Sequence, residues 1–305
     1  MKNLLPLMQR EWLQHRMAWA LLMLLPLAIA LLPLMLANIQ IESDLASRTS
    51  PDLALILGTL SIVVTAAVIF LLLWVTSLFI TSGVPRRDHA DRSVEFWLSL
   101  PTGHAESFVA PLLVHLVLVP AAALVVGLLG GYAISAVLVT RFVGIGEWLA
   151  LPWALVLSGT GALVLRVMAG LPLAALWLMP LVLLAMLANA LFKRWGLPVL
   201  AVGLGLGSVL LQQVFGQPLL GQVLAGLGNN AARSLMGASG QSLEFTDRAP
   251  LAPVLASVPQ WAGNDLLAAV RDLANPLFIG AMAVSAALFT ALVLWRQRGA
   301  GVGGG

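Results

Sequence analysis

The stretch MAWALLMLLPLAIALLPLMLA, residues 17–37, contains no charged side chain and decides the class of fold. A helix needs roughly 20 apolar residues to cross a hydrocarbon core about 30 Å thick, and this run is long enough. Arg16 precedes the run, and a polar stretch beginning at Asn38 follows it. The run therefore predicts a membrane-spanning helix over residues 16–37.

Five further apolar runs follow along the chain. The 305 residues are 60% hydrophobic and only 10% charged, with a mean hydropathy of +0.98, whereas about a quarter of a soluble domain is charged. Because the runs are continuous rather than alternating, they indicate helices and not barrel strands. We therefore expect an all-α polytopic membrane protein with six transmembrane helices, over residues 16–37, 53–82, 108–140, 171–192, 197–215 and 276–295.

The N-terminus has a different pattern from the spans. Residues 2–16 carry Leu4, Leu5, Met8 and Trp12 on one helical face, with most of the polar side chains elsewhere. An amphipathic helix of this kind typically lies in the membrane interface. We therefore expect an N-terminal interfacial helix before the first span.

Three other segments are assigned by their polarity. Residues 148–165 contain Pro152 and several small polar residues, which favours an interfacial or re-entrant segment over a span. Residues 216–275 are rich in Gly, Asn, Ser and Pro and are expected on the extracytoplasmic side. The Gly-rich tail 299–305 is expected to be flexible. Residues 1–298 then form a single transmembrane domain.

The distribution of charge supports this topology. With a cytoplasmic N-terminus, six spans place ten of the sixteen Lys and Arg residues inside, together with five acids. The inside then carries +5 (ten minus five) and the outside −2 (+3 minus +5), as the positive-inside rule requires. Because the basic residues lie at the ends of apolar runs, they indicate topology and no nucleic-acid partner. The inside residues are Lys2, Arg10, Arg16, Arg86, Arg87, Arg92, Lys193, Arg194, Arg296 and Arg298, with Glu11, Asp88, Asp91, Glu95 and Glu106.

The chain lacks the motif of an ATPase. A nucleotide-binding loop needs the pattern Gly-x-x-x-x-Gly-Lys-Ser/Thr, in which one Lys reaches the phosphates. The only lysines are Lys2 and Lys193, and neither lies in this pattern. We therefore expect no catalytic residue and no cofactor on this chain, and any ATP hydrolysis belongs to another polypeptide.

The chain has four histidines and no cysteine. Helical zinc sites typically carry two ligands four residues apart, and we expect no such pairing of the histidines with each other or with acids, so no metal site is predicted. His115 alone lies inside a predicted span, and an intramembrane ionisable residue is a functional candidate. Arg166 lies in an apolar stretch, and we expect its side chain to reach the outer headgroups. The histidines are His15, His89, His104 and His115.

The charged segment 86–106 is the most informative part of the sequence. It contains DRSVEFWLSLP at residues 91–101, between the second and third predicted spans. Val94, Trp97 and Leu98 have helical spacing and predict a short cytoplasmic helix with an apolar face. Such a face packs against lipid headgroups or against a soluble partner, and the pattern leaves both possibilities open.

This segment resembles the cytoplasmic loop of type-2 ABC export permeases, in which an acidic–basic pair, a short apolar string, Trp and a Ser-Leu-Pro ending recur. The N-terminal helix, the six spans and the long connection before the last span extend the resemblance over nearly the whole chain. The resemblance implies an exporter in the bacterial inner membrane, with both termini cytoplasmic. It also implies pairing with a second permease copy or a homologous permease, and with an ABC ATPase that holds ATP and Mg.

By the same resemblance, the coupling helix transmits the motion of the ATPase to the permease. The residues that would contact the ATPase are Asp91, Arg92, Glu95, Phe96 and Trp97.

A translocation path would lie between two permease copies, and polar or aromatic side chains within the spans are candidates to line it. An ATP-independent secondary transporter and a non-transporting membrane scaffold are the alternatives. Ion coupling requires a membrane-buried carboxylate, and the six predicted spans contain no Asp or Glu. The candidates for the path are Trp74, Thr76, Ser77, His115, Gln212 and Gln213.

Overall fold

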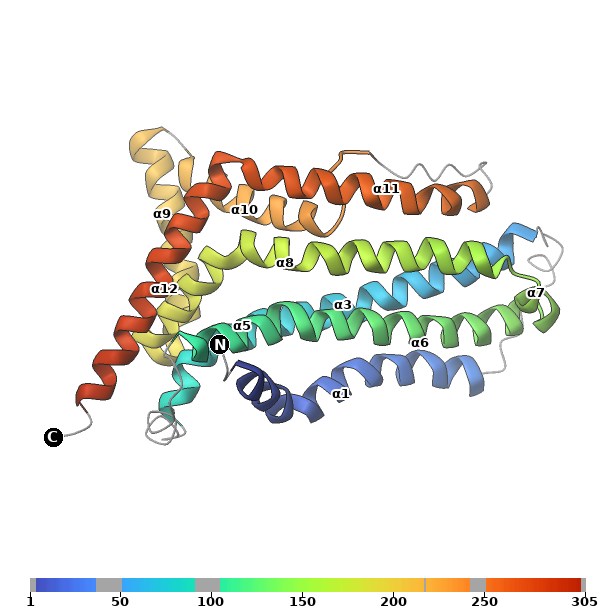
Figure 1. The fold of residues 1–305 in the computed structure, drawn as a ribbon, viewed down its shortest axis with the longest axis horizontal. Helices are drawn as coiled ribbons and strands as arrows, with labels where there is room; N and C mark the ends of the chain where they lie inside the picture. The colour runs from blue at the N-terminus through green and yellow to red at the C-terminus, as the bar shows by residue number, and fades with distance from the viewer. Residues whose placement is uncertain (1–3, 37–50, 91–104, 217, 242–250, 303–305) are drawn as a thin grey trace.

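The computed structural model describes residues 4–36, 51–90, 105–216, 218–241 and 251–302, and every regular element in these ranges is helical. Figure 1 shows the arrangement of the helices. The α-helices are α1 (Leu4–Leu36), α3 (Pro51–Ala90), α5 (Glu106–Leu113), α6 (Val119–Phe142), α7 (Ile145–Leu149), α8 (Trp153–Phe192), α9 (Gly196–Phe215), α10 (Leu219–Leu235), α11 (Leu251–Arg271) and α12 (Pro276–Val302). Shorter turns are the π-helix η1 (Val114–Leu118) and the 3-10 turns η2 (Lys193–Trp195) and η3 (Asp272–Ala274).

Five stretches of the described residues are long and apolar enough to cross a membrane. They cover all six predicted spans, because the fourth stretch contains both residues 171–192 and residues 197–215. This result confirms an all-helical chain that is compatible with a multi-pass membrane protein, but it does not confirm six separate spans. The stretches are Leu4–Leu36, Leu53–Pro85, Glu106–Phe142, Trp153–Phe215 and Pro276–Gln297.

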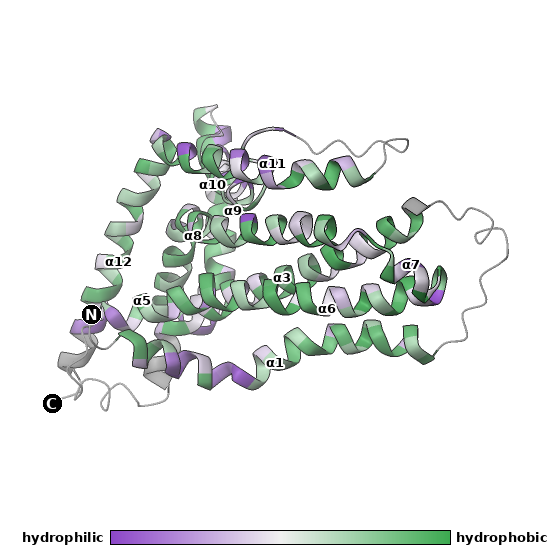
Figure 2. Cartoon of the chain, turned by 45° about the vertical axis from the view of Figure 1, so that its right-hand side comes forward, coloured by the Kyte–Doolittle hydropathy of each residue, from purple (hydrophilic) through white to green (hydrophobic). Residues whose placement is uncertain are grey.

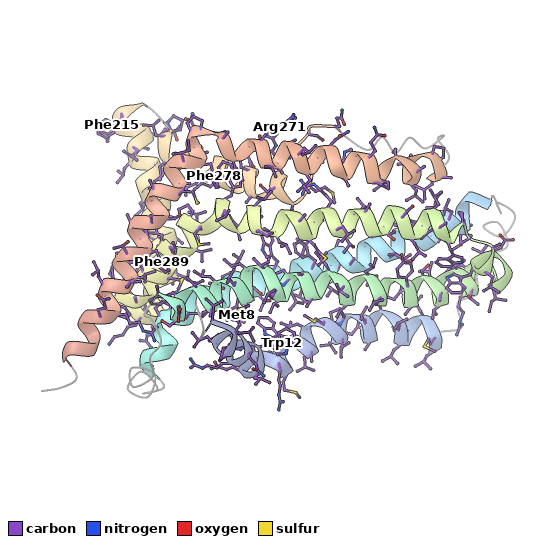
Figure 3. The ribbon with its side chains drawn as sticks, in the orientation of Figure 1. Met8, Trp12, Phe215, Arg271, Phe278 and Phe289 are labelled. Carbon is purple, nitrogen blue, oxygen red and sulfur yellow. The ribbon has the colours of Figure 1, made fainter. Side chains whose placement is uncertain are left out.

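Helix α1 is continuous through the boundary predicted between residues 16 and 17. The expected interfacial helix is therefore the beginning of α1 and not a separate element. On its apolar face, Leu5 and Trp12 are exposed while Met8 packs against the core. Figure 3 labels Met8 and Trp12 near the beginning of α1.

Helix α8 corrects the assignment of residues 148–165. Most of this segment forms the first turns of α8, which is one continuous helix of 40 residues. One of the small residues that suggested an irregular segment is a packing site, since a Cβ on Gly159 would lie 3.0 Å from the Leu255 side chain of α11. Figure 1 shows the second half of α8, which contains Pro172 and Pro180, turned away from the first half.

The tightest packing is between α3 and α6. A Cβ on Gly127 would lie 2.8 Å from the Cα of Ala66, and one on Gly131 would lie 2.7 Å from the Cα of Ile62. Only glycine permits this separation of two helix backbones. Figure 2 shows that the long helices are largely apolar along their lengths. The closely packed helices α3 and α6 therefore form the centre of the protein.

Residues 216–275, expected as a polar extracytoplasmic segment, contain α10 and α11. Both helices pack against α8, with Leu227, Ala231 and Leu255 buried. Helix α12 ends at Val302, within the Gly-rich residues 299–305 for which the sequence predicts a flexible tail. Phe278 and Phe289 of α12, labelled in Figure 3, contact Trp177 of α8 and Phe108 of α5 with ring centroids 5.0 and 6.4 Å apart.

Candidate functional site

The predicted coupling residues Asp91, Arg92, Glu95, Phe96 and Trp97 lie outside the described residues. The helices on either side of them are described. Near these helices, one apolar cluster contains Val84 of α3, Phe108 of α5, Met186 of α8 and Leu292 of α12. Segment 91–104 thus connects two helices that share a core with the ends of α8 and α12.

Three of the candidates for a path, Trp74, Thr76 and Ser77, lie on α3. The Trp74 ring stacks on Phe70 with centroids 5.7 Å apart, and the Thr76 hydroxyl donates to the Leu72 carbonyl at 2.7 Å. Ser77 is fully buried, and its hydroxyl has no partner among the described residues. Packing and local hydrogen bonding account for the first two side chains.

The other three candidates for a path lie on other helices. Gln212 and Gln213 are exposed on α9, and His115 is buried on η1. None of the six candidates lines either of the two apolar cavities that we describe below. The structure therefore does not bring the six residues into a single site.

Two apolar cavities lie among the helices. The first, of about 250 Å³, lies between α3, α6 and α8, and Thr160 is the one polar residue in its lining. The second, of about 520 Å³, is lined by α5, η1, α8 and α12, with Ser285 as its one polar residue. Both linings lack ionisable side chains, so the chemistry of this chain must be sought elsewhere.

His115 belongs to a buried polar cluster that joins α1 to η1, which we call the histidine cluster and define as Glu11, His15 and His115. The Nε2 atom of His115 lies 3.3 Å from Oε2 of Glu11, and both side chains are almost completely buried. The rings of His15 and His115 meet edge to face with centroids 5.6 Å apart. Trp19 covers the cluster, with its ring centroid 5.6 Å from that of His115.

The histidine cluster shows a fault in the sequence analysis. Glu11 and His15 are four residues apart and lie on one face of α1, so the expectation that no histidine pairs with an acid at this spacing is wrong. Glu11 precedes the first predicted span, 16–37, and is buried within the candidate membrane-spanning stretch Leu4–Leu36. The contact with His115 connects residues 104 positions apart, and helical spacing alone does not predict it.

A second buried cluster corrects the prediction for Arg166. This side chain does not reach a surface: its Nη2 and Nε atoms lie 2.7 and 2.9 Å from Oδ2 of Asp265, and both side chains are fully buried. Nη1 also donates to the carbonyl of Ser234 at 2.8 Å. We call Arg166 and Asp265 the arginine–aspartate pair. It connects α8 to α11 and to the end of α10.

The carboxylate of Asp265 also accepts hydrogen bonds from the backbone of residues that follow α10. Its carboxylate accepts the backbone N–H groups of Gly237 at 3.0 Å and Ser239 at 2.7 Å. Burial raises the pKa of Asp265, but the hydrogen bonds from Ser239 and Gly237 and the charge of Arg166 outweigh it, and the net pKa is lowered. The carboxylate is therefore ionised at neutral pH.

Comparison with protein-family models, with curated proteins and with solved structures finds no match to this chain.

Proposed function

We propose that the chain is a membrane transport protein, and more specifically the permease subunit of an ATP-binding-cassette exporter. The observation that carries the proposal is the segment DRSVEFWLSLP at residues 91–101, between two apolar helices. Because the chain contains no nucleotide-binding loop, a separate ATPase chain binds ATP and Mg. A second copy of this permease, or a homologous one, completes the transporter.

The positions of the helix ends support this proposal. In Figure 1, the end of α3, the start of α5 and both chain termini lie toward the same end of the molecule. The basic residues Arg10, Lys193 and Arg296 belong to α1, η2 and α12 near that end. Such a grouping of basic residues is typical of a cytoplasmic side, which is where an ATPase would bind.

In this proposal the apolar face around Trp97 docks into a groove on the ATPase. Buried aromatic residues commonly contribute more than 1 kcal/mol to such interfaces, and charged residues surround them. Asp91, Arg92, Glu95 and Phe96 supply the charged and aromatic surroundings. Closure of two ATPases on ATP would then move the two permease copies relative to each other.

Secondary transport is the second candidate, and one observation favours it. Ion-coupled transporters use buried ionisable side chains, and Glu11 and His115 form such a pair. Transport of that kind would depend on an ion gradient and not on ATP hydrolysis. The two candidates therefore predict different sources of energy.

The test is the variant Trp97→Ala, purified from its native membrane together with any bound ATPase. Loss of more than 1 kcal/mol of binding weakens docking by more than about fivefold. We expect much lower ATP hydrolysis per permease, with unchanged membrane insertion. Trp195→Ala is the matched control, because Trp195 is an exposed tryptophan outside the segment. Equal hydrolysis by wild type and Trp97→Ala would refute the coupling role.

A further inference from the structure

We propose that the histidine cluster, Glu11, His15 and His115, binds a divalent transition-metal cation of the zinc type. One carboxylate and two imidazoles form a ligand set that Zn²⁺ commonly uses. The three side chains each offer a ligand atom, and all three atoms lie within 4.8 Å of one another. This inference goes beyond the proposed transport function and does not depend on it.

The distances in the cluster are close to those of a coordinated ion. Bonds of about 2.0–2.2 Å to nitrogen and oxygen, in a tetrahedral arrangement, place two ligand atoms about 3.3 Å apart. The Nε2 atom of His115 and Oε2 of Glu11 are already separated by 3.3 Å. The ligand atom of His15 lies within 4.8 Å of the other two.

His115 has unused bonding capacity. Its side chain is fully buried, and Nδ1 has no hydrogen-bond partner among the described residues. A buried polar atom without a partner costs about 1–3 kcal/mol, so native proteins rarely keep one without a reason. A cation bound at Nδ1, in place of Nε2, would supply the missing partner.

The backbone around His115 is also unusual. His115 lies in the π-helical turn η1, between Pro111 of α5 and Pro120 of α6. Single π-helical turns are rare and occur frequently at functional sites, because the wider turn changes the direction of a side chain. The π-helical turn is therefore a second feature of His115 that is typical of a functional site, in addition to its unpartnered Nδ1 atom.

The surroundings indicate an exchangeable ion. Glu11, His115 and Trp19 are buried, whereas His15 is only partly buried and connects the cluster to the surface of α1. Structural zinc sites are closed by four protein ligands, but this cluster supplies three and leaves one position for water or another ligand. The bound ion would also clamp α1 to η1.

The experiment is a titration of the full-length chain in detergent, purified without a polyhistidine tag and stripped with a chelator. Zn²⁺ binding is measured by competition with a chromophoric chelator, and Co²⁺ is added separately to record its visible absorption. We expect one ion per chain and the absorption bands of four-coordinate Co²⁺ with nitrogen and oxygen ligands. A wild-type chain that binds no stoichiometric ion would overturn the proposal.

The variants His15→Ala, His115→Ala and Glu11→Gln identify the ligands. Loss of outer-shell partners alone changes metal affinity about 10–100-fold, so loss of a ligand should weaken Zn²⁺ binding by about 100-fold or more. His89→Ala and His104→Ala are the controls and should bind as wild type does. Helicity of each metal-free variant is measured to exclude unfolding. Unchanged affinity in His15→Ala and His115→Ala, with the fold intact, would place any bound ion elsewhere and refute the assignment.

Discussion

The protein contains two buried charge clusters that differ in how completely their polar atoms are bonded. In the arginine–aspartate pair, Nε, Nη1 and Nη2 of Arg166 all donate, and both carboxylate oxygens of Asp265 accept. In the histidine cluster, the contact between Glu11 and His115 is 3.3 Å long, and Nδ1 of His115 has no partner among the described residues.

This difference separates a structural role from a binding role. A buried ion pair offsets its desolvation only when additional hydrogen bonds satisfy its remaining polar atoms, and the arginine–aspartate pair meets this condition. A partly satisfied buried cluster is a poor source of stability but leaves polar atoms free to bind a ligand. We therefore expect the first cluster to hold α8, α10 and α11 together, and the second to bind an ion.

The largest effect is expected for Asp265→Ala. Removal of one partner leaves the Arg166 charge buried and unpaired, which costs about 3–5 kcal/mol in comparable proteins. We expect the free energy of unfolding in detergent to fall by this amount, measured by denaturant titration. Asp272→Asn is the matched control, because the Arg233–Asp272 pair is partly exposed at 3.6 Å and such pairs contribute about 0–1 kcal/mol. Similar losses in both variants would contradict the structural role.

Because the pKa of Asp265 is lowered, the contribution of the arginine–aspartate pair to the free energy of unfolding should depend on pH. A carboxyl whose folded-state pKa lies below its ordinary value of 3.8 contributes its full stability above that value. The contribution is lost as pH falls through the lowered folded-state pKa. Wild type should therefore lose stability in acid below about pH 4, and Asp265→Asn should lack that part of the loss.

A smaller effect on stability is expected for a substitution at Gly170 of α8, which lies beside the arginine–aspartate pair. A Cβ on Gly170 would overlap the carbonyl oxygen of Ser234 and lie 2.7 Å from Nη1 of Arg166. Gly170→Ala should therefore destabilise the chain by about 1–3 kcal/mol, measured in the same titration. Gly161→Ala, on the same helix, meets nothing within 4 Å and should be neutral or stabilising by up to about 1 kcal/mol. Equal behaviour of the two variants would show that the packing at Gly170 is loose.

The smallest effect on stability is expected in the histidine cluster. The double variant Glu11→Met/His115→Leu replaces both ionisable groups by apolar side chains of similar volume, and such swaps usually cost less than about 1.5 kcal/mol. We expect thermal unfolding of the metal-free double variant close to that of metal-free wild type. A loss as large as that of Asp265→Ala would show that this cluster, too, is required for folding.

Local patterns in the sequence predicted much of the fold, because continuous apolar runs need only neighbouring residues to be recognised. The runs at 53–82, 108–140 and 276–295 are each contained in one apolar helix. Helices α1 and α8 are continuous across the boundaries that the sequence analysis set near residues 16 and 165. The small residues near residue 160 resemble a loop in sequence, but they lie within α8, and Gly159 permits close packing of α11 on this helix.

The charge clusters were harder to predict, because their partners are distant along the chain. Arg166 and Asp265 are 99 residues apart, and their contact depends on how α11 folds back onto α8. Only the Glu11–His15 spacing on α1 was visible locally. The predicted path residues were chosen by polarity within a span, a criterion that does not distinguish a lining residue from Thr76, which bonds its own helix.

The most direct test of the proposed function is to purify the tagged wild-type chain from its native membrane in mild detergent. The chains that co-elute are identified, and ATP hydrolysis is measured on the same sample. We predict a stoichiometric soluble chain with a phosphate-binding loop, and hydrolysis that vanadate inhibits. Recovery of the chain alone across mild conditions, with no ATP hydrolysis, would contradict the assignment as an ATP-driven permease.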